Sequence, residues 1–234
     1  MKVWTFVEGP PDRLALEALF DSCGWSKKLR SAGHGIHVID LGNKTKLLRT
    51  IGTRAARYLA ANTKDLAIGL PDLYPFREYD NTEYQHHDVS ELGLLQARMV
   101  ERSLRDTFRI KDDSAVQNRF LGAAFRHDLE VLLLAAEQHL SSYLSATSNL
   151  GQWRKMVEDQ NDTDPPKRVI ERVFRTKHPR RIAYQDTHHA PAVLRRVSTL
   201  GELIFLPSGQ VRCPIFKTVI DWIAARTGVD PYAP

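Results

Sequence analysis

"KVWTFVEGPPD", residues 2–12, decides how the first part of this chain is expected to fold. The segment KVWTFV is rich in β-branched and aromatic residues, which is typical of a buried strand. Glu8 closes the apolar run, Gly9 allows a tight turn, and helical periodicity follows Asp12, which can cap that helix. The stretch therefore predicts a strand that brings a carboxylate to its end and turns at once into a helix.

The alternation of strand and helix continues outward from this stretch. Residues 35–42 and 65–70 are predicted as strands, and a fourth strand is predicted near 120–125. Residues 43–62 carry apolar side chains at helical spacing, namely Leu47, Ile51, Ala55 and Leu59. This order of strands and helices predicts an α/β fold built on a parallel sheet with right-handed crossovers.

The later part of the chain is expected to be mainly helical. One helix is predicted over about 89–108 and another from about Asp128, and the region after about residue 141 is helical and basic. We predict an α/β domain over 1–140 and a helical, basic part over 141–234 that packs on it. No flexible Gly/Ser linker marks this boundary, so one continuous domain is the alternative.

Composition narrows the function classes. The two cysteines, Cys23 and Cys213, lie far apart and form no CxxC pair, so we expect neither a zinc cluster nor a disulfide framework, and we expect a cytoplasmic setting. We expect no secretory leader, and no apolar run approaches the roughly 18 residues that span a bilayer. The net charge of +5 suits a polyanionic partner.

The positive charge is concentrated in residues 165–184. This segment contains seven basic residues: Lys167, Arg168, Arg172, Arg175, Lys177, Arg180 and Arg181. A cluster of this kind can contact phosphates of a nucleic acid. The alternative is a solvated helix face without a ligand, and the sequence leaves both interpretations open.

Acidic residues follow the predicted strands. Glu8 ends the first strand, Asp40 lies within the end of the second, and Asp72 follows the third. Ligands of open α/β sheets bind at the carboxyl ends of the strands. Carboxylates that converge there repel each other unless a cation such as Mg²⁺ lies among them. Asp12 alone is better explained as a helix cap, whereas Glu8 has no obvious capping role.

These residues carry a resemblance to a known superfamily. "FVEGPPD" looks like the Glu-Gly-x-x-Asp segment that opens the Toprim (topoisomerase–primase) domain, and Asp72 in "GLPDLYPF" stands where that superfamily places the first Asp of its Asp-x-Asp motif. The chain resembles in particular a branch of bacterial Toprim-like proteins that is often encoded beside an ABC-type ATPase. Four later stretches are similar to that branch: "FRHDLEVLLLA", "EDQNDTDPPKRV", "YQDTHHAPAVLRRV" and "RCPIFKTVIDWI".

The resemblance implies a Rossmannoid parallel sheet and a site that binds Mg²⁺ or Mn²⁺. It implies an acid/base and metal role for Glu8 and metal binding for Asp72. The second acid of the Toprim pair is missing, because Leu73 and Tyr74 follow Asp72. Asp12, Glu130 or Asp40 would have to replace it. Asp12 and Glu130 are expected as supporting metal ligands, and Glu130 can equally serve as a partner of its helix dipole.

The resemblance also implies a phosphate-binding patch. His127 is expected to donate to a phosphate or to orient Glu130, although a buried structural histidine is the alternative. Lys167 and Arg168 are expected to hold the scissile phosphate or to position the strand. The branch tends to have Lys where this chain has Asp186.

The function implied is a metal-dependent nuclease acting on DNA or RNA. By analogy, the setting is bacterial anti-phage defence with an ABC-type ATPase as partner, and a homo-oligomer is left open. The missing second acid favours an alternative, a catalytically inactive module that binds nucleic acid or the ATPase. A nucleotide-binding phosphatase is a third hypothesis. Trp25, Trp153 and Trp222 are expected to pack in the protein rather than to stack on bases.

Overall fold

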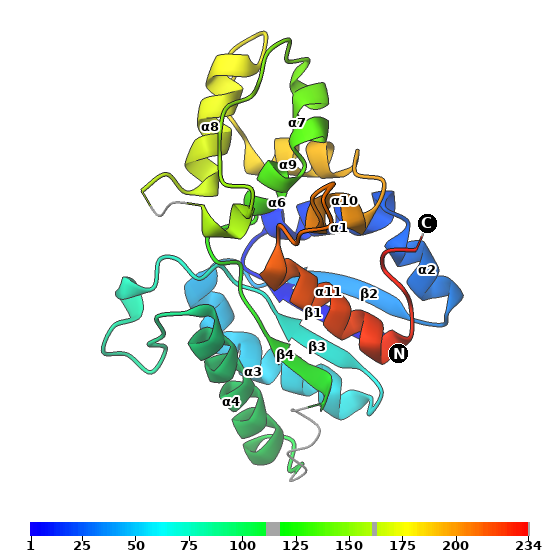
Figure 1. The fold of residues 1–234 in the computed structure, drawn as a ribbon. Helices are drawn as coiled ribbons and strands as arrows, with labels where there is room; N and C mark the ends of the chain where they lie inside the picture. Colours follow the sequence, from blue (N-terminus) through cyan, green and yellow to red (C-terminus); the bar gives the residue numbers. More distant parts are fainter. Residues whose placement is uncertain (111–117, 161–162, 234) are drawn as a thin grey trace. The chain divides into compact units, whose positions relative to one another are not determined.

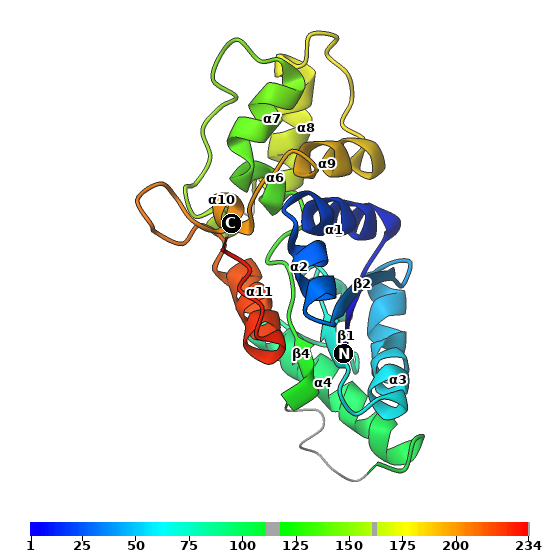
Figure 2. The ribbon, with the colours of Figure 1, turned by 90° about the vertical axis from the view of Figure 1, so that its right-hand side faces the viewer.

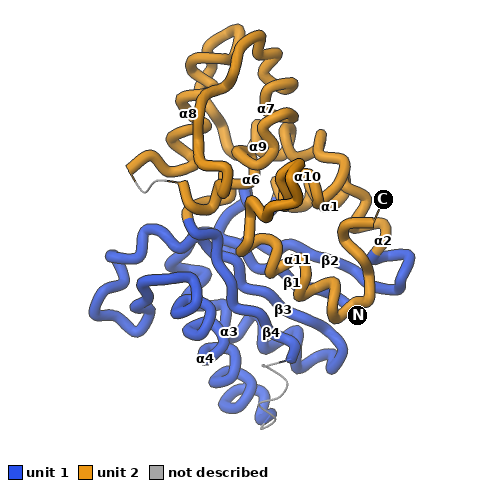
Figure 3. The backbone as a smooth tube through the Cα atoms, viewed as in Figure 1, with its two compact units in different colours: residues 1–13, 29–126 blue, residues 14–28, 127–234 orange. Residues whose placement is uncertain are grey.

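The computed structural model describes residues 1–110, 118–160 and 163–233. The chain divides into two compact units, which Figure 3 distinguishes by colour. Unit 1 comprises residues 1–13 and 29–126, and unit 2 comprises residues 14–28 and 127–234. The predicted boundary near residue 140 falls inside a helix of unit 2, and the domain division at that point stays a prediction.

Unit 1 is built on a four-stranded sheet in which all strands run parallel. The strands are β1 (Lys2–Val7), β2 (Gly35–Asp40), β3 (Leu66–Gly69) and β4 (Phe120–Gly122). Their order across the sheet is β2-β1-β3-β4 (Figure 1). The predicted α/β class, the parallel sheet flanked by helices and all four strands are therefore confirmed.

Two long helices of unit 1 cover one face of this sheet (Figure 2). They are α3 (Lys44–Ala61) and α4 (Val89–Asp106), and the side chains predicted to face the core from α3 are all buried. Glycines let the layers approach closely: a Cβ on Gly93 would lie 2.5 Å from the carbonyl oxygen of Gly122 in β4. A short 3₁₀ turn, η1 (Arg77–Tyr79), precedes α4.

Helix α1 (Pro10–Ser22) begins three residues earlier than the sequence predicts. Proline suits the first helical turn, because the amides there have no partner within the helix. Asp12 consequently lies inside the first turn, and its carboxylate accepts the backbone N–H of Gly9 at 2.9 Å. The prediction of Asp12 as the N-cap residue is therefore wrong, since Asp12 is the third residue of the helix and bonds to the residue that precedes the helix. Helix α2 (Trp25–Ser31) follows.

Among its described residues, unit 2 contains seven further helical segments. These are α6 (Val131–Ala135), α7 (Glu137–Leu144), the 3₁₀ turn η2 (Val157–Asp159), α8 (Pro166–Lys177), α9 (Asp186–Leu194), α10 (Leu200–Ile204) and α11 (Pro214–Thr227). The helix predicted from about Asp128 begins at Val131 instead, and its five residues are all buried. The helical character predicted for this part of the chain is confirmed.

A buried acid ties two parts of unit 2 together. The carboxylate of Glu158, which is buried, accepts the backbone N–H groups of Ile215 at 2.7 Å and Phe216 at 3.0 Å. These are amides of the first turn of α11, which have no acceptor within the helix. Glu158 therefore caps α11 from a distant segment. Among the described residues, the helices lack the length and apolarity needed to cross a membrane.

Candidate functional site at the carboxyl end of the sheet

The predicted site residues fall into two groups. Glu8, Asp12 and Asp72 belong to unit 1. The other four, which are His127, Glu130, Lys167 and Arg168, belong to unit 2. We describe each group from its own neighbours.

Glu8 lies directly after β1 and reaches the end of β3. Its Oε1 accepts the backbone N–H of Asp72 at 3.0 Å, across 64 residues of chain. Parallel neighbouring strands place their carboxyl ends at one edge of a sheet, which brings these two segments together. The prediction that Glu8 lies beside the segment of Asp72 is therefore confirmed, while a metal role for either residue stays a prediction.

The ionisation of Glu8 is shifted. Burial disfavours the carboxylate and raises the pKa of Glu8 to about 7, and the nearby charge of Asp12 adds to this effect. The Asp72 amide and the ammonium of Lys44 oppose the shift. A carboxyl with this pKa exchanges its proton near neutral pH, which is the property that a general acid or base requires.

Lys44, the first residue of α3, is a site residue that the sequence reasoning missed. It is only 5% exposed, and its ammonium donates to the carbonyl oxygens of Leu73 and Pro75. Burial lowers the pKa of Lys44 to about 8, against the attraction of Glu8 and Asp72. The sequence contained an indication of this role. Lys44 follows the second predicted strand by only a few residues, so its helix starts at the same sheet edge as Glu8 and Asp72.

A buried histidine lies beside this lysine. His86 is fully buried, and its Nδ1 lies 2.7 Å from the carbonyl oxygen of Tyr84. Burial lowers the pKa of His86, which keeps the imidazole neutral. His86 and Lys44 both lie against the ring of Tyr79. These contacts hold the loop after β3 on which Asp72 lies.

Asp40 is engaged in an ion pair at this edge. Its carboxylate lies 2.9 Å from the Nε of Arg13, in the first turns of α1. The pair is about one-third exposed on each side, which makes it a modest contribution to stability. Asp40 is thus a less suitable substitute for the missing second Toprim acid than the sequence suggested.

The oxygen donors at this edge fit a hard cation only in part. Mg²⁺ is usually held by one or two carboxylates together with water and substrate oxygens, so Glu8 and Asp72 are sufficient in kind. Among the described residues, however, no three His, Cys, Asp or Glu side chains are grouped as a metal site. The buried ammonium of Lys44 already supplies positive charge to both acids. A metal here would depend on water and substrate for its other ligands.

Unit 2 holds a second group of acids. Glu130, which is buried, accepts the hydroxyl of Tyr184 at 3.0 Å, and burial raises its pKa. Burial, with the charge of Glu130, raises the pKa of Asp128 well above its usual range. Burial and the negative charge of the neighbouring Glu130 therefore both favour the protonated form of Asp128. The sequence reasoning named Glu130 but missed Asp128 and Tyr184.

The residues predicted to bind phosphate differ in how exposed they are and in whether they already have partners. Arg168 is exposed, whereas His127 is only 5% exposed. The Lys167 ammonium lies 3.0 Å from Asp186, and its backbone N–H donates to Asp128 at 3.3 Å. Burial lowers the pKa of Lys167, but the neighbouring carboxylates, Glu130 first, more than offset this and raise it. Asp186 therefore competes with any phosphate for Lys167.

Comparison with known proteins identifies no relative of this chain. A scan against models of protein families, a search of curated proteins and a search of solved structures each returned no match to this chain. The resemblance to the Toprim superfamily accordingly stays a prediction. What the chain does is therefore argued from its own residues, above all from the half-buried carboxyl of Glu8 at the sheet edge.

Proposed function

We propose that this chain is a Toprim-like, Mg²⁺-dependent nuclease that hydrolyses phosphodiester bonds in DNA or RNA. One observation carries the proposal: Glu8 lies at the carboxyl end of β1, is bonded to the Asp72 backbone and has a pKa of about 7. Strongly shifted acids at ligand-binding edges are typical of catalytic sites. Removal of a proton from water near neutral pH is the chemistry that such an acid serves.

The residues of unit 1 have distinct roles in this proposal. In its ionised form, Glu8 either accepts the proton of the attacking water or joins Asp72 in holding the metal. Asp12 is the supporting acid. Bound Mg²⁺ would neutralise charge on the phosphate oxygens. Lys44 keeps a positive charge beside Glu8 and fixes the loop that carries Asp72 through its bonds to Leu73 and Pro75.

The residues of unit 2 serve substrate binding in the same proposal. Arg168 is exposed and offers a planar, bidentate donor to a phosphate. Lys167 would exchange its ion pair with Asp186 for a phosphate contact. His127 and Glu130 complete the patch that the resemblance implies. The anti-phage setting and the ABC-type ATPase partner rest on that resemblance alone, whereas the cytoplasmic setting rests on the cysteine pattern.

The test is cleavage of labelled DNA and RNA with Mg²⁺, with Mn²⁺ and with a chelator. We expect cleavage that the chelator abolishes and that Glu8→Gln reduces at least about 100-fold, since removal of a general base typically costs roughly 10²–10⁴ in rate. Asp72→Asn is expected to raise the metal concentration that half-saturates the rate. Glu83→Gln, at an exposed glutamate of unit 1, is the matched control and should leave the rate unchanged.

Two outcomes would overturn the nuclease. One is cleavage that Glu8→Gln leaves intact, which would place the chemistry elsewhere or in a contaminant. The other is no cleavage of either nucleic acid, with or without a co-expressed ATPase. The rate should also rise with pH around pH 7, because Glu8 must be deprotonated to act as a base.

A binding module without catalysis is the second candidate, and Lys44 favours it. A buried ammonium that acts on both Glu8 and Asp72 supplies the charge that a metal would otherwise supply. This candidate predicts nucleic-acid binding without cleavage, measured by fluorescence anisotropy. The binding would be unchanged in Glu8→Gln and lost in Lys167→Ala/Arg168→Ala.

A further inference from the structure

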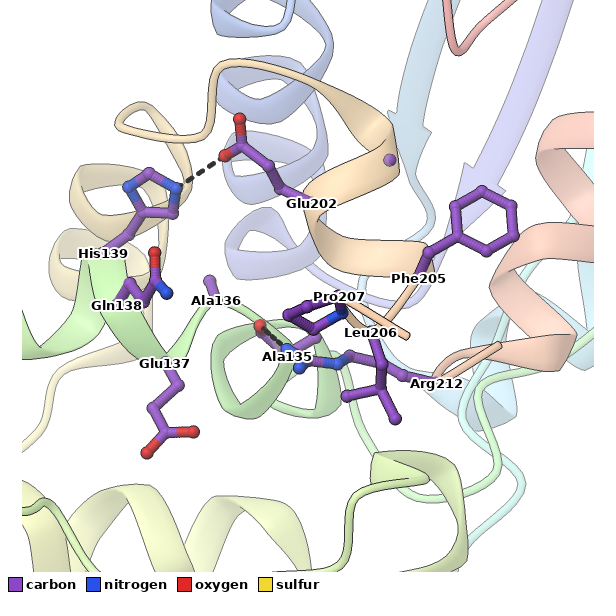
Figure 4. A pocket seen from close by; sticks show the side chains of 11 residues that line it. Ala135, Ala136, Glu137, Gln138, His139, Glu202, Phe205, Leu206, Pro207 and Arg212 are labelled. Atoms are coloured by element: carbon purple, nitrogen blue, oxygen red, sulfur yellow. Dashed lines mark hydrogen bonds and ion pairs between the residues drawn. The ribbon is translucent and has the colours of Figure 1, made fainter. Parts of the chain in front are cut away.

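Two adjoining cavities lie in unit 2, away from the residues described above. The first has a volume of about 360 Å³ and the second about 350 Å³. They share four lining residues, which are Glu137, Leu206, Pro207 and Arg212. Both volumes lie at the lower end of the roughly 300–1,000 Å³ that ligand pockets occupy. Figure 4 shows the first cavity with these shared residues.

Hydrogen bonds hold the residues of the shared wall in place. The Arg212 side chain donates to the carbonyl oxygen of Ala135, as Figure 4 shows. The Arg212 backbone bonds to Ile204 at 2.8 Å and to Val157 at 3.2 Å. Leu206 donates to Gln210 at 2.8 Å, which closes the turn that carries Pro207. The guanidinium is therefore held in place, and its Nε has no acceptor among the described residues.

The two cavities differ in charge. In the first, Glu202 and His139 pair at 2.8 Å across the cavity wall (Figure 4). The second cavity is lined by Arg154 and Lys155 in addition to Arg212, and Glu137 is its only acid among the described residues. The ion pairs found in the described part of the chain include neither Arg154 nor Lys155. The second cavity therefore favours an anion.

The second cavity also offers an aromatic surface. Trp153, which the sequence suggested as a packing residue, is half-buried and lines this cavity beside Arg154 and Lys155. Gln160 fixes the segment: its Oε1 accepts the Arg154 backbone N–H at 3.2 Å and its Nε2 donates to Asp164 at 3.1 Å. An indole next to several cations is the combination that recognises a base together with its phosphate.

We propose that the second cavity binds a nucleotide, with its base against Trp153 and its phosphate among Arg154, Lys155 and Arg212. A bare phosphate would leave the indole unused, and an apolar ligand would leave the cations unmatched. The nucleotide is either a free mononucleotide or the 5′-terminal nucleotide of a nucleic-acid chain. Binding at this site involves no bond cleavage and is independent of the proposed nuclease reaction.

The test is isothermal titration of the full chain with AMP, adenosine and inorganic phosphate. AMP is expected to bind more tightly than either fragment, because only AMP uses the indole and the cations together. Trp153→Ala should weaken AMP binding at least about fivefold, the lower range for loss of one base–aromatic stack. Arg154→Ala/Lys155→Ala should weaken AMP binding and flatten its dependence on salt.

Matched controls exclude a general charge effect. Arg175→Ala/Arg195→Ala removes the same charge from exposed positions of unit 2 outside the cavity and should leave AMP binding unchanged. A 5′-phosphorylated trinucleotide distinguishes the sources: tighter binding than AMP indicates a strand terminus, and weaker binding indicates a free nucleotide. The proposal is overturned if AMP at millimolar concentration gives no heat, or if the cavity variants and the control bind AMP alike while unfolding at the wild-type temperature.

Discussion

The two acidic sites both place a lysine near shifted carboxyl groups, but the lysines differ. At the sheet edge of unit 1, Lys44 is buried, bonds to backbone carbonyls and has a lowered pKa of about 8. In unit 2, Lys167 is about half-exposed, pairs with Asp186 and has a raised pKa. The acids differ as well, since Glu8 lies beside the buried ammonium of Lys44, whereas Asp128 has a second carboxyl group, that of Glu130, as its neighbour.

This difference shows which site can change its charge near neutral pH. Glu8 and Lys44 have pKa values of about 7 and about 8, so small changes in their surroundings alter the charge of the site. In unit 2, burial and the charge of Glu130 both favour the protonated form of Asp128 and raise its pKa well above the usual range. We therefore expect proton transfer in unit 1 and charge-stable binding in unit 2.

Among the proposed substitutions, the largest change in the free energy of unfolding is expected at Lys44. Lys44→Met removes the donor to two carbonyl oxygens and the charge beside Glu8, and should lower the free energy of unfolding by about 3 kcal/mol. Urea unfolding measures this change. Lys46→Met is the matched control, because Lys46 is exposed on the same helical turn and should change stability by less than about 0.5 kcal/mol. Equal effects of both variants would contradict the buried role of Lys44.

Glu8→Gln should cause the second-largest change in the free energy of unfolding, and this change should be an increase. The folded pKa of about 7 exceeds the ordinary value of 4.5, so the folded state keeps the proton while the unfolded chain releases it. The free energy of unfolding therefore falls as pH rises from about 4.5 to about 7. The variant lacks this fall and should be about 2 kcal/mol more stable than wild type at pH 8, after allowance for partial exposure.

Unfolding free energies of wild type and Glu8→Gln, taken between about pH 5 and about pH 8, measure this difference. The substituted amide is expected to keep the contact to the Asp72 N–H, because its side-chain carbonyl remains an acceptor. A wild-type free energy of unfolding that stays level across this range would show that Glu8 ionises as it does in the unfolded chain.

Tyr184→Phe tests the acid pair of unit 2. It removes the hydroxyl that donates to Glu130 and should lower the free energy of unfolding by about 1.5 kcal/mol, as expected for a hydrogen bond to a charged group. Thermal or urea unfolding gives the value. A double-mutant cycle with Glu130→Gln should show coupling, and additive effects would argue against the hydrogen bond.

The smallest effect is expected at Lys167. Its ion pair with Asp186 is partly exposed, so Lys167→Met should cost less than about 1 kcal/mol, and the cost should shrink at high salt. Unfolding in low and high sodium chloride measures it. A loss as large as that of Lys44→Met would show that the two lysines are equivalent and would remove the contrast between the sites.

Much of the fold followed from local sequence patterns, and less of the site did. β1 was predicted with both ends correct, and the core face of α3 was predicted from its spacing. Lys44 was missed because helical periodicity treats a lysine as a solvent-facing residue. Asp128 was missed because its burial depends on tertiary packing, and the backbone N–H that it accepts, that of Lys167, lies 39 residues further along the chain.

The sequence alone determined that a parallel sheet forms and that Glu8 and Asp72 follow neighbouring strands, since periodicity and turn residues are local properties. Only the tertiary structure decided how these groups ionise. Burial raises the pKa values of Glu8 and Asp128 and lowers that of Lys44, while backbone donors and charges from distant segments modify each shift. Those effects depend on distances between residues that are remote in the chain, so no local pattern contains them.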